Sequence, residues 1–355
     1  MRDGCTADAS STGCNDRQDV TKQSSALPAK ITCRAVSGRL DVGSDTAALT
    51  SCNRRSPASH PLSTHSDSGI TPIADNGLEP YYQENDAMLT KRRKSRLGYI
   101  PDTPDIRDHH YTPDPSVLKV LPAKVDLTPT FEVYDQGPIG SCTANALAGA
   151  VQFERLKIGE RPNFIPSRLF IYYNERTIEG DIKYDAGATL RDGIKTLHKL
   201  GVCPEEEWPY VATPAQEEGG EFPPGAPAAT IPPERCYQDA LKYTITNYQR
   251  LSQDLSHLQG CLACGFPFVF GFTVYSSWMD LKNLPVVVPL PCGKDKPEGG
   301  HAVLCVGYDN ATQLFKFRNS WGKNVGENGY FYMPYAYLLD HRLTQDIWAI
   351  NTVKS

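Results

Sequence analysis

Apolar residues follow helical spacing in the first half of the region after residue 130 and strand spacing in its second half. The stretch 142–158 is small and apolar around most of its circumference, which predicts a buried helix that ends near Gly159. Residues 166–175 and 189–200 predict two further helices, the second with its apolar positions on one face. The opening half of this region is therefore expected to be helical.

Later runs combine aromatic and β-branched residues and are separated by turn residues, a pattern typical of strands. They cover residues 267–275, 301–308, 314–319 and 329–333. A Pro- and Gly-rich connection is expected at 212–233, and a short helix at 252–264. Helices followed by strands predict an α+β fold with a cleft where the two halves meet.

The chain before residue 131 lacks this periodicity. Residues 1–80 contain no Phe, Trp or Tyr, so they bury too little apolar surface to offset the entropy of ordering, and we expect 1–96, with its basic linker at 91–96, to be disordered. Residues 97–130 are rich in Pro and Asp, which predicts an extended arm that lies across the surface of the 131–355 domain and partly covers the cleft.

Composition excludes several classes of function. The net charge is −5, without the basic surplus of nucleic-acid-binding proteins, and no apolar run is long enough to cross a membrane. The N-terminus lacks the apolar centre of a signal peptide, which favours an intracellular protein.

The chain has eleven cysteines, whose count alone fixes neither their pairing nor the redox compartment. Cys203 and Cys236 bracket the Pro/Gly-rich connection and are candidates for a disulfide. Cys261, Cys264 and His257 have partial metal-ligand spacing, but no second pair of ligands follows them. We therefore expect core packing here and no metal site.

Cys142 begins the first predicted helix, directly after a glycine-containing loop. Backbone N–H groups and the helix dipole at such a position favour the thiolate and lower the pKa of the thiol. This is how a nucleophile is prepared, although a buried packing cysteine is the alternative reading of the same pattern.

Three further residues supply what a cysteine nucleophile requires. His301 begins an apolar strand after two glycines and is the candidate base, and Asn319, at the end of the next strand, is placed to accept a hydrogen bond from the imidazole. Gln136, six residues before Cys142, is the candidate amide donor to an oxyanion. Each has an ordinary structural reading alone, but their combination in this order favours catalysis.

The combination resembles the papain family of cysteine peptidases, in its divergent bacterial and viral, xylellain-like branch. The similarity extends from about Leu121 to Met333, and the sequence Asn319-Ser320-Trp321-Gly322 carries its most specific motif. The resemblance implies a two-lobed papain-like fold, with a mainly helical lobe at 131–212 and a β-barrel-like lobe at 234–355. It also implies that Gln136, Cys142, His301 and Asn319 are the oxyanion donor, nucleophile, base and orienting residue of a monomeric endopeptidase without metal or organic cofactor.

The sequence departs from the better-known members at two positions beside the nucleophile. Ile139 replaces a cysteine, so their disulfide near the active site cannot form, and Thr143 replaces an aromatic residue. Two alternatives to peptide hydrolysis remain open at this point: transpeptidation or acyl transfer on the same residues, and a catalytically silent homologue that binds peptides.

Overall fold

The computed structural model describes residues 97–279 and 284–353. The expected disorder of residues 1–96, including the basic linker, lies outside the described residues. No helix in the described ranges is both long and apolar enough to cross a membrane.

The helices predicted from the sequence are present, and capping side chains mark the start of α4 and α5. Helix α3 spans Cys142–Lys157, α4 spans Arg168–Glu179 and α5 spans Leu190–Lys199. The side chain of Ser167 accepts a hydrogen bond from the backbone of α4, and Thr189 does the same for α5. Shorter helical segments are α2 (Pro115–Leu118), α6 (Glu234–Ala240), α7 (Leu255–Ala263), α8 (Tyr335–Leu338) and the 3-10 turns η1 (Pro227–Ala229) and η2 (Ser276–Trp278).

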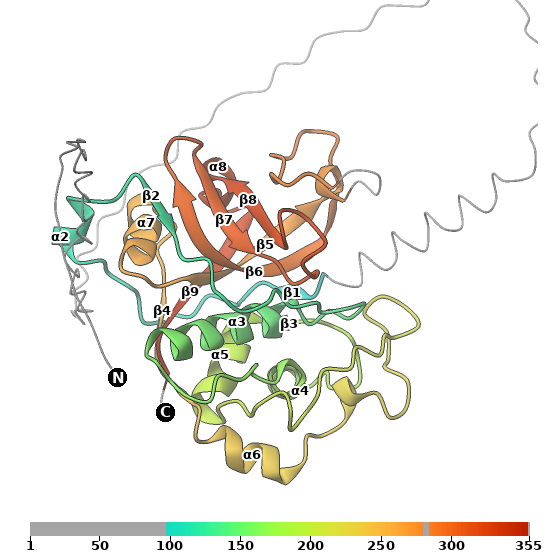
Figure 1. Ribbon diagram of the computed structural model, residues 1–355. Helices are drawn as coiled ribbons and strands as arrows, with labels where there is room; N and C mark the ends of the chain where they lie inside the picture. Colours follow the sequence, from blue (N-terminus) through green and yellow to red (C-terminus); the bar gives the residue numbers. More distant parts are fainter. Residues whose placement is uncertain (1–96, 280–283, 354–355) are drawn as a thin grey trace, which may run out of the picture. The chain divides into compact units, whose positions relative to one another are not determined.

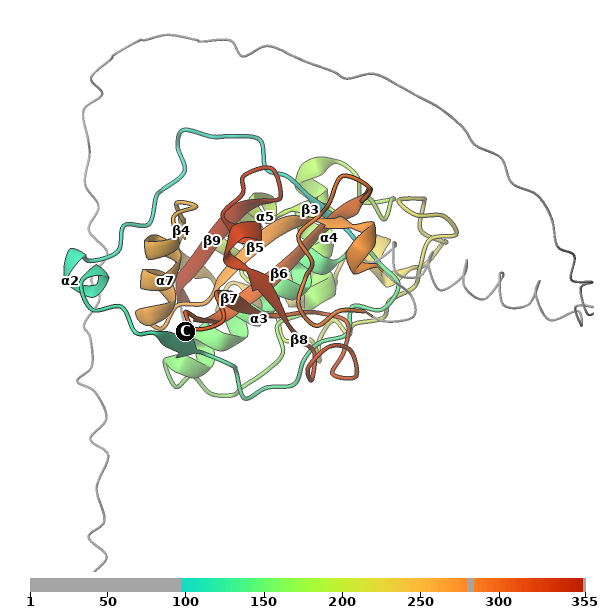
Figure 2. The same cartoon turned by 90° about the horizontal axis from the view of Figure 1, so that it is seen from above.

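A seven-stranded sheet forms the second layer. Its strands are β2 (Lys124–Asp126), β4 (Ile245–Arg250), β5 (Phe268–Tyr275), β6 (Pro297–Asp309), β7 (Leu314–Arg318), β8 (Tyr330–Pro334) and β9 (Thr344–Val353). The order is β4-β9-β5-β6-β7-β8, and β2 adds to β6. Figure 2 shows β5, β6 and β7 side by side, and all pairings in this sheet are antiparallel.

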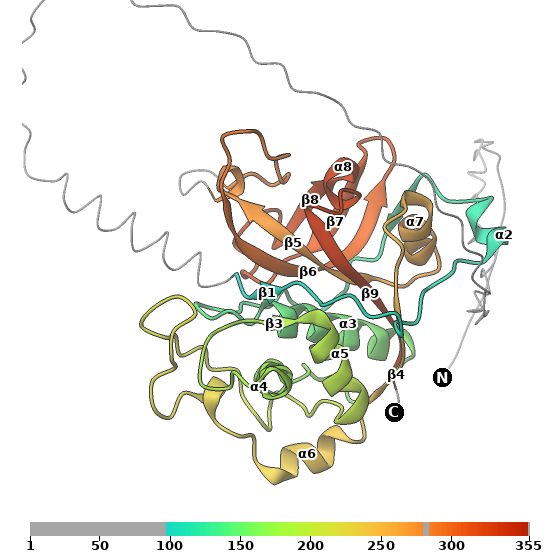
Figure 3. The same cartoon turned by 180° about the vertical axis from the view of Figure 1, so that it is seen from behind.

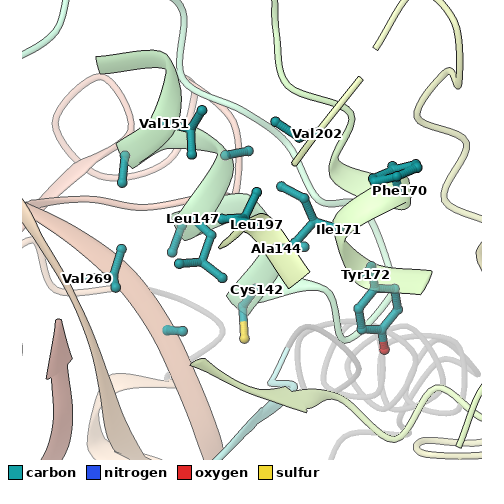
Figure 4. Packing of buried hydrophobic residues seen from close by; sticks show 14 of the residues in the cluster. Cys142, Ala144, Leu147, Val151, Phe170, Ile171, Tyr172, Leu197, Val202 and Val269 are labelled. Carbon is teal, nitrogen blue, oxygen red and sulfur yellow. The ribbon is translucent and has the colours of Figure 1, made fainter. Parts of the chain in front are cut away.

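The two faces of the sheet bury different clusters of apolar residues. Figure 1 shows α3, α4, α5 and α6 together on one side of the sheet. Val269 and Leu304 point to this side and join the core around α3, whereas their neighbours Phe268 and Cys305 point to the other core, to which α7 contributes. In Figure 4, α3 lies between Val269 of β5 and Ile171 of α4, which explains why most of its circumference is buried.

The β-barrel-like lobe expected from the resemblance is not confirmed, because the sheet stays open. Among the described residues, the end strands β4 and β8 do not pair with each other. The outer edge of β8 is instead bonded by the irregular segment 286–288: Tyr332 donates to the carbonyl of Val286 at 2.9 Å, and Val288 donates to that of Tyr332 at 2.8 Å. This segment pairs with backbone groups at the edge of β8 without forming a strand that closes the sheet.

The first residues of the arm run between the helical layer and the sheet, whereas most of residues 103–110 are exposed. The short strand β1 (Tyr99–Ile100) pairs in parallel with β3 (Ala188–Thr189), which directly precedes α5. Figures 1 and 3 both show β1 between β6 and α3. Farther along, Tyr111 donates its backbone N–H to Arg250 at 2.8 Å. The arm therefore passes the start of α3, where the candidate nucleophile lies.

Candidate active site

The fold brings the predicted cysteine, at the start of α3, to the strand β6 that carries the predicted histidine. Cys142 is the first residue of α3, and its sulfur accepts hydrogen bonds from the backbone N–H groups of Ala302 and Gly98. Ala302 follows His301 on β6, so the thiol lies against the strand that carries the imidazole. Figure 4 shows the sulfur at the N-terminal end of α3, beyond Ala144 and Leu147 of the same helix.

His301 and Asn319 form the predicted hydrogen bond. The distance from Nε2 of His301 to Oδ1 of Asn319 is 2.8 Å, and both side chains are buried. The Trp321 ring lies 4.9 Å from the imidazole, measured between ring centroids, and is itself buried. It shields the pair from water, which strengthens the bond in its low-dielectric surroundings.

Gln136 is held in the loop that leads to Cys142. Its side-chain oxygen accepts a hydrogen bond from the hydroxyl of Ser320 at 2.6 Å, and its amide nitrogen donates to the carbonyl of Ile139 at 2.8 Å. The backbone N–H of Gln136 donates to Ser320 as well, at 2.8 Å. These bonds attach the loop to the segment that follows Asn319, so the four predicted residues belong to one region.

The expected low pKa of Cys142 is wrong for this structure. The thiol is fully buried, and burial raises its pKa to about 12, because the charged thiolate loses its contact with water. The backbone hydrogen bonds from Ala302 and Gly98 act in the opposite direction but do not compensate. Part of the covering comes from Gly98, a residue of the arm.

Tyr210 supports the loop before Cys142, a role that the sequence did not reveal. Its hydroxyl lies 2.6 Å from Oγ of Ser141 and donates to the carbonyl oxygen of Gln136 at 2.8 Å. The guanidinium of Arg168 lies over its ring, 3.8 Å from the centroid. Tyr210 lies within the stretch that resembles the papain family, but nothing in the sequence indicated these contacts.

Replacing Tyr210 by phenylalanine should lower kcat/KM for a peptide substrate by roughly fivefold to twentyfold. The hydroxyl holds two positions of the loop, and its loss costs about 1 kcal/mol of hydrogen bonding there. Steady-state kinetics on the full chain tests this. Tyr332→Phe is the control, because that hydroxyl bonds only the exposed Glu327 at 2.9 Å. Equal kinetics in both variants would show that the Tyr210 hydroxyl does not position the loop.

The arm is anchored beside the site by a cluster of buried charges. Tyr99 donates its hydroxyl to Asp346 at 2.5 Å, and the backbone N–H of Asp102 donates to the same carboxylate at 2.6 Å. Asp102 in turn accepts from the backbone of Arg191 at 3.0 Å and from the indole of Trp348 at 3.0 Å. Further members are Asp108 and Arg250, which complete a set of three carboxylates and two guanidinium groups.

This cluster predicts that the docked arm is less stable at neutral than at acidic pH. Burial and the neighbouring charge of Asp346 raise the pKa of Asp102 from 3.8 to about 6. The pKa of Asp102 is higher in the folded than in the unfolded chain. Its contribution to the free energy of unfolding is therefore fully present below pH 4 and is lost as pH rises through 6. This pKa shift corresponds to at most about 3 kcal/mol in the free energy of unfolding.

Equilibrium unfolding in urea between pH 4 and pH 7 measures this effect. The free energy of unfolding of wild type should fall more steeply over this pH range than that of Asp102→Asn. The variant has no titrating group at position 102. Glu206→Gln, which removes an exposed carboxyl, is the control and should leave the slope of wild type unchanged. Parallel pH curves for wild type and Asp102→Asn would contradict the prediction.

Comparisons with known proteins identify the family of this chain. The family model of papain family cysteine proteases matches residues 121–337. The uncharacterized peptidase C1-like protein L477 of Acanthamoeba polyphaga mimivirus is 36% identical over 292 residues, which cover 75% of this chain and 90% of the viral protein. Cathepsin B-like CP3 of Giardia intestinalis is 30% identical over 204 residues, 56% of this chain and 63% of that protein.

A solved structure supports the same assignment. The crystal structure of xylellain, a cysteine protease from Xylella fastidiosa, is 63% identical in sequence, with a TM-score of 0.72 over 74% of this chain and 98% of xylellain. The predicted likeness to the bacterial and viral branch is thereby confirmed. The chain belongs to the papain family of cysteine proteases.

Proposed function

We propose that this chain hydrolyses peptide bonds through a Cys-His-Asn triad formed by Cys142, His301 and Asn319. The observation that carries the proposal is the position of the Cys142 sulfur against the backbone N–H of Ala302, directly after a histidine whose Nε2 lies 2.8 Å from Asn319. Two residues that are far apart in sequence then act as nucleophile and base. The substrate lies in a cleft between the helical lobe and the sheet.

The reaction follows from the chemistry of these groups. Cys142 gives its proton to His301, and the thiolate attacks the carbonyl carbon of the scissile bond. The Gln136 amide and the backbone N–H of Cys142 donate to the oxyanion that forms. His301 then protonates the leaving amine, and water, deprotonated by the same imidazole, hydrolyses the thioester. Asn319 accepts the other imidazole N–H and so keeps the ring in the required orientation.

The arm makes the described form latent. Gly98 presents its backbone N–H to the sulfur of Cys142, while its carbonyl oxygen accepts a hydrogen bond from Ala188 at 2.8 Å. The nucleophile therefore meets an amide hydrogen instead of a carbonyl carbon, and the arm blocks the site without being cut there. A peptide substrate has to displace residues 97–100 to reach Cys142.

Active-site labelling with a substrate assay tests the proposed function. An epoxysuccinyl probe should label one thiol per chain and stop hydrolysis of a fluorogenic peptide library, and peptide mapping should place the label on Cys142. Product analysis with an added amine separates hydrolysis from transpeptidation, since an acyl-amine product would reveal transfer. A chain that binds peptides but neither cleaves them nor reacts with the probe would refute the proposal.

A further inference from the structure

A pair of cysteines lies in the helical layer, apart from the proposed triad. Cys203 follows α5, Cys236 lies in the first turn of α6, and both are buried. Their sulfur atoms and a carboxylate oxygen of Glu207 all lie within 4.8 Å of one another. The disulfide suggested from the sequence is not formed in the structure, where both thiols are free and are hydrogen-bonded to each other. Neither takes part in the chemistry proposed for Cys142.

The backbone around the two thiols is fixed from both sides. Gly201 has φ +74°, and a Cβ there would come within 1.9 Å of the carbonyl oxygen of Ala240, so only glycine lets this segment pack against the end of α6. The carbonyl of Cys203 accepts a hydrogen bond from the backbone of Ser167 at 2.9 Å. The backbone therefore holds the two sulfur atoms within 4.8 Å of each other.

Charges of both signs surround the pair, because Arg235 and the carboxylate of Glu207 both lie beside it. The side chain of Arg235 is hydrogen-bonded to the sulfur of Cys236 and also lies near Glu207. A guanidinium group in this place repels a divalent metal ion but stabilises a thiolate on Cys236. Burial is the largest cause that raises the pKa of both thiols, and at Cys236 the hydrogen bonds from Cys203 and Arg235 oppose it.

We propose that Cys203 and Cys236 are a redox site, whose disulfide links the segment after α5 to α6. The thiolate of Cys236 attacks a low-molecular-weight disulfide such as oxidised glutathione and releases one equivalent of the reduced thiol. Cys203, after losing its proton to solvent, attacks the mixed disulfide and releases the second equivalent. Two electrons pass from the protein to the glutathione disulfide. Because both sulfurs are buried, the exchange takes place when α6 opens locally.

The disulfide would close a ring of 34 residues, from 203 to 236, that contains a support of the active site. Within the ring, the carbonyl of Trp208 accepts a hydrogen bond from Ser167 at 2.8 Å, and Tyr210 contacts the loop before Cys142. Restricting the unfolded chain in this way should raise the melting temperature of the oxidised protein by roughly 5 to 10 °C. The redox state of the two cysteines would then determine how strongly residues 203–236 are restrained.

The test uses the full chain with Cys142→Ala, which removes the proposed nucleophile as a competing thiol. The protein is incubated with a glutathione redox buffer, and its melting temperature and its peptide map under non-reducing conditions are recorded. We expect a linked peptide that joins Cys203 to Cys236, with a rise in melting temperature that a reducing agent reverses. Cys236→Ser should abolish both effects. Cys292→Ser, which removes an exposed thiol, should leave both unchanged.

Three outcomes would overturn the proposal. The first is a map without this linkage even after refolding in the redox buffer, and the second is a linkage through Cys292 instead. The third is one tightly held equivalent of Zn²⁺ that protects both thiols, which would assign a metal site. If Cys236→Ser does not fold, Cys203→Ala with Cys236→Ala replaces it, because two small apolar residues leave no unpaired thiol. None of these results depends on peptidase activity.

Discussion

Replacement of Cys142 by alanine should abolish peptide hydrolysis, with kcat/KM of the full chain falling by at least about 10⁴-fold. Cys142 is the proposed nucleophile, and its sulfur lies against the strand that carries His301, whereas Gln136 and Asn319 are proposed only to polarise the substrate and to orient the imidazole. The fold should persist, because an alanine fits where a buried thiol makes bonds only to backbone N–H groups. Hydrolysis of a fluorogenic peptide and the melting temperature measure the two effects separately.

The matched control for this prediction is Cys292→Ala. Cys292 is an exposed free thiol in the turn before β6, so its loss should change neither the rate nor the labelling by an epoxysuccinyl probe. Cys142→Ala should instead lose the label. If Cys142→Ala keeps more than a few per cent of the wild-type rate, with contaminating peptidases excluded by an inactive His301→Ala preparation, the nucleophile lies elsewhere.

Local sequence patterns were sufficient to predict helices α3, α4, α5 and α7, but not α2, α6 and α8, and they suggested the residues of the candidate triad. The helices α4 and α5 begin after Ser167 and Thr189, and the structure places hydrogen-bonding caps at these positions. The pairing of His301 with Asn319 was predicted from motifs that lie on two neighbouring strands of the sheet. Such features depend on spacing within short segments, which a sequence displays directly.

Strand β9 was not predicted, although it lies between β4 and β5 inside the sheet. It begins with polar residues, and Asp346 has φ +54°, which interrupts the alternation along the strand. This left-handed residue carries the carboxylate that binds Tyr99 of the arm, at a sequence separation of 247 residues. A pattern read along the chain cannot reveal a strand that owes its position to partners so distant.

The arm also explains why the expected pKa of Cys142 was wrong. The argument from the helix N-terminus considered only residues next to Cys142 in sequence. In the folded chain, Gly98 and β6 lie over the thiol, and the loss of water outweighs the favourable backbone hydrogen bonds. The expectation that the arm partly covers the cleft remains part of the proposed function, and it is open to a direct test.

Replacing Gly98 by alanine should raise kcat/KM of the full chain by roughly tenfold to a hundredfold. A Cβ at this position would lie 1.7 Å from the carbonyl oxygen of Gly140, which is backbone and has no room to move. The docked position of the arm is therefore excluded, while the domain that carries the triad keeps its own contacts. Because only the undocked fraction binds substrate, the apparent rate rises in proportion to that fraction.

Two further measurements distinguish release of the arm from a general loosening of the fold. Alkylation of Cys142 by iodoacetamide should accelerate in Gly98→Ala, since the thiol becomes exposed and its pKa falls. Gly293→Ala is the control, because a Cβ there meets nothing within 4 Å, and it should leave both rates at the wild-type value. If Gly98→Ala neither raises hydrolysis nor speeds alkylation, the arm does not restrict access to Cys142, and the latency proposed here has another source.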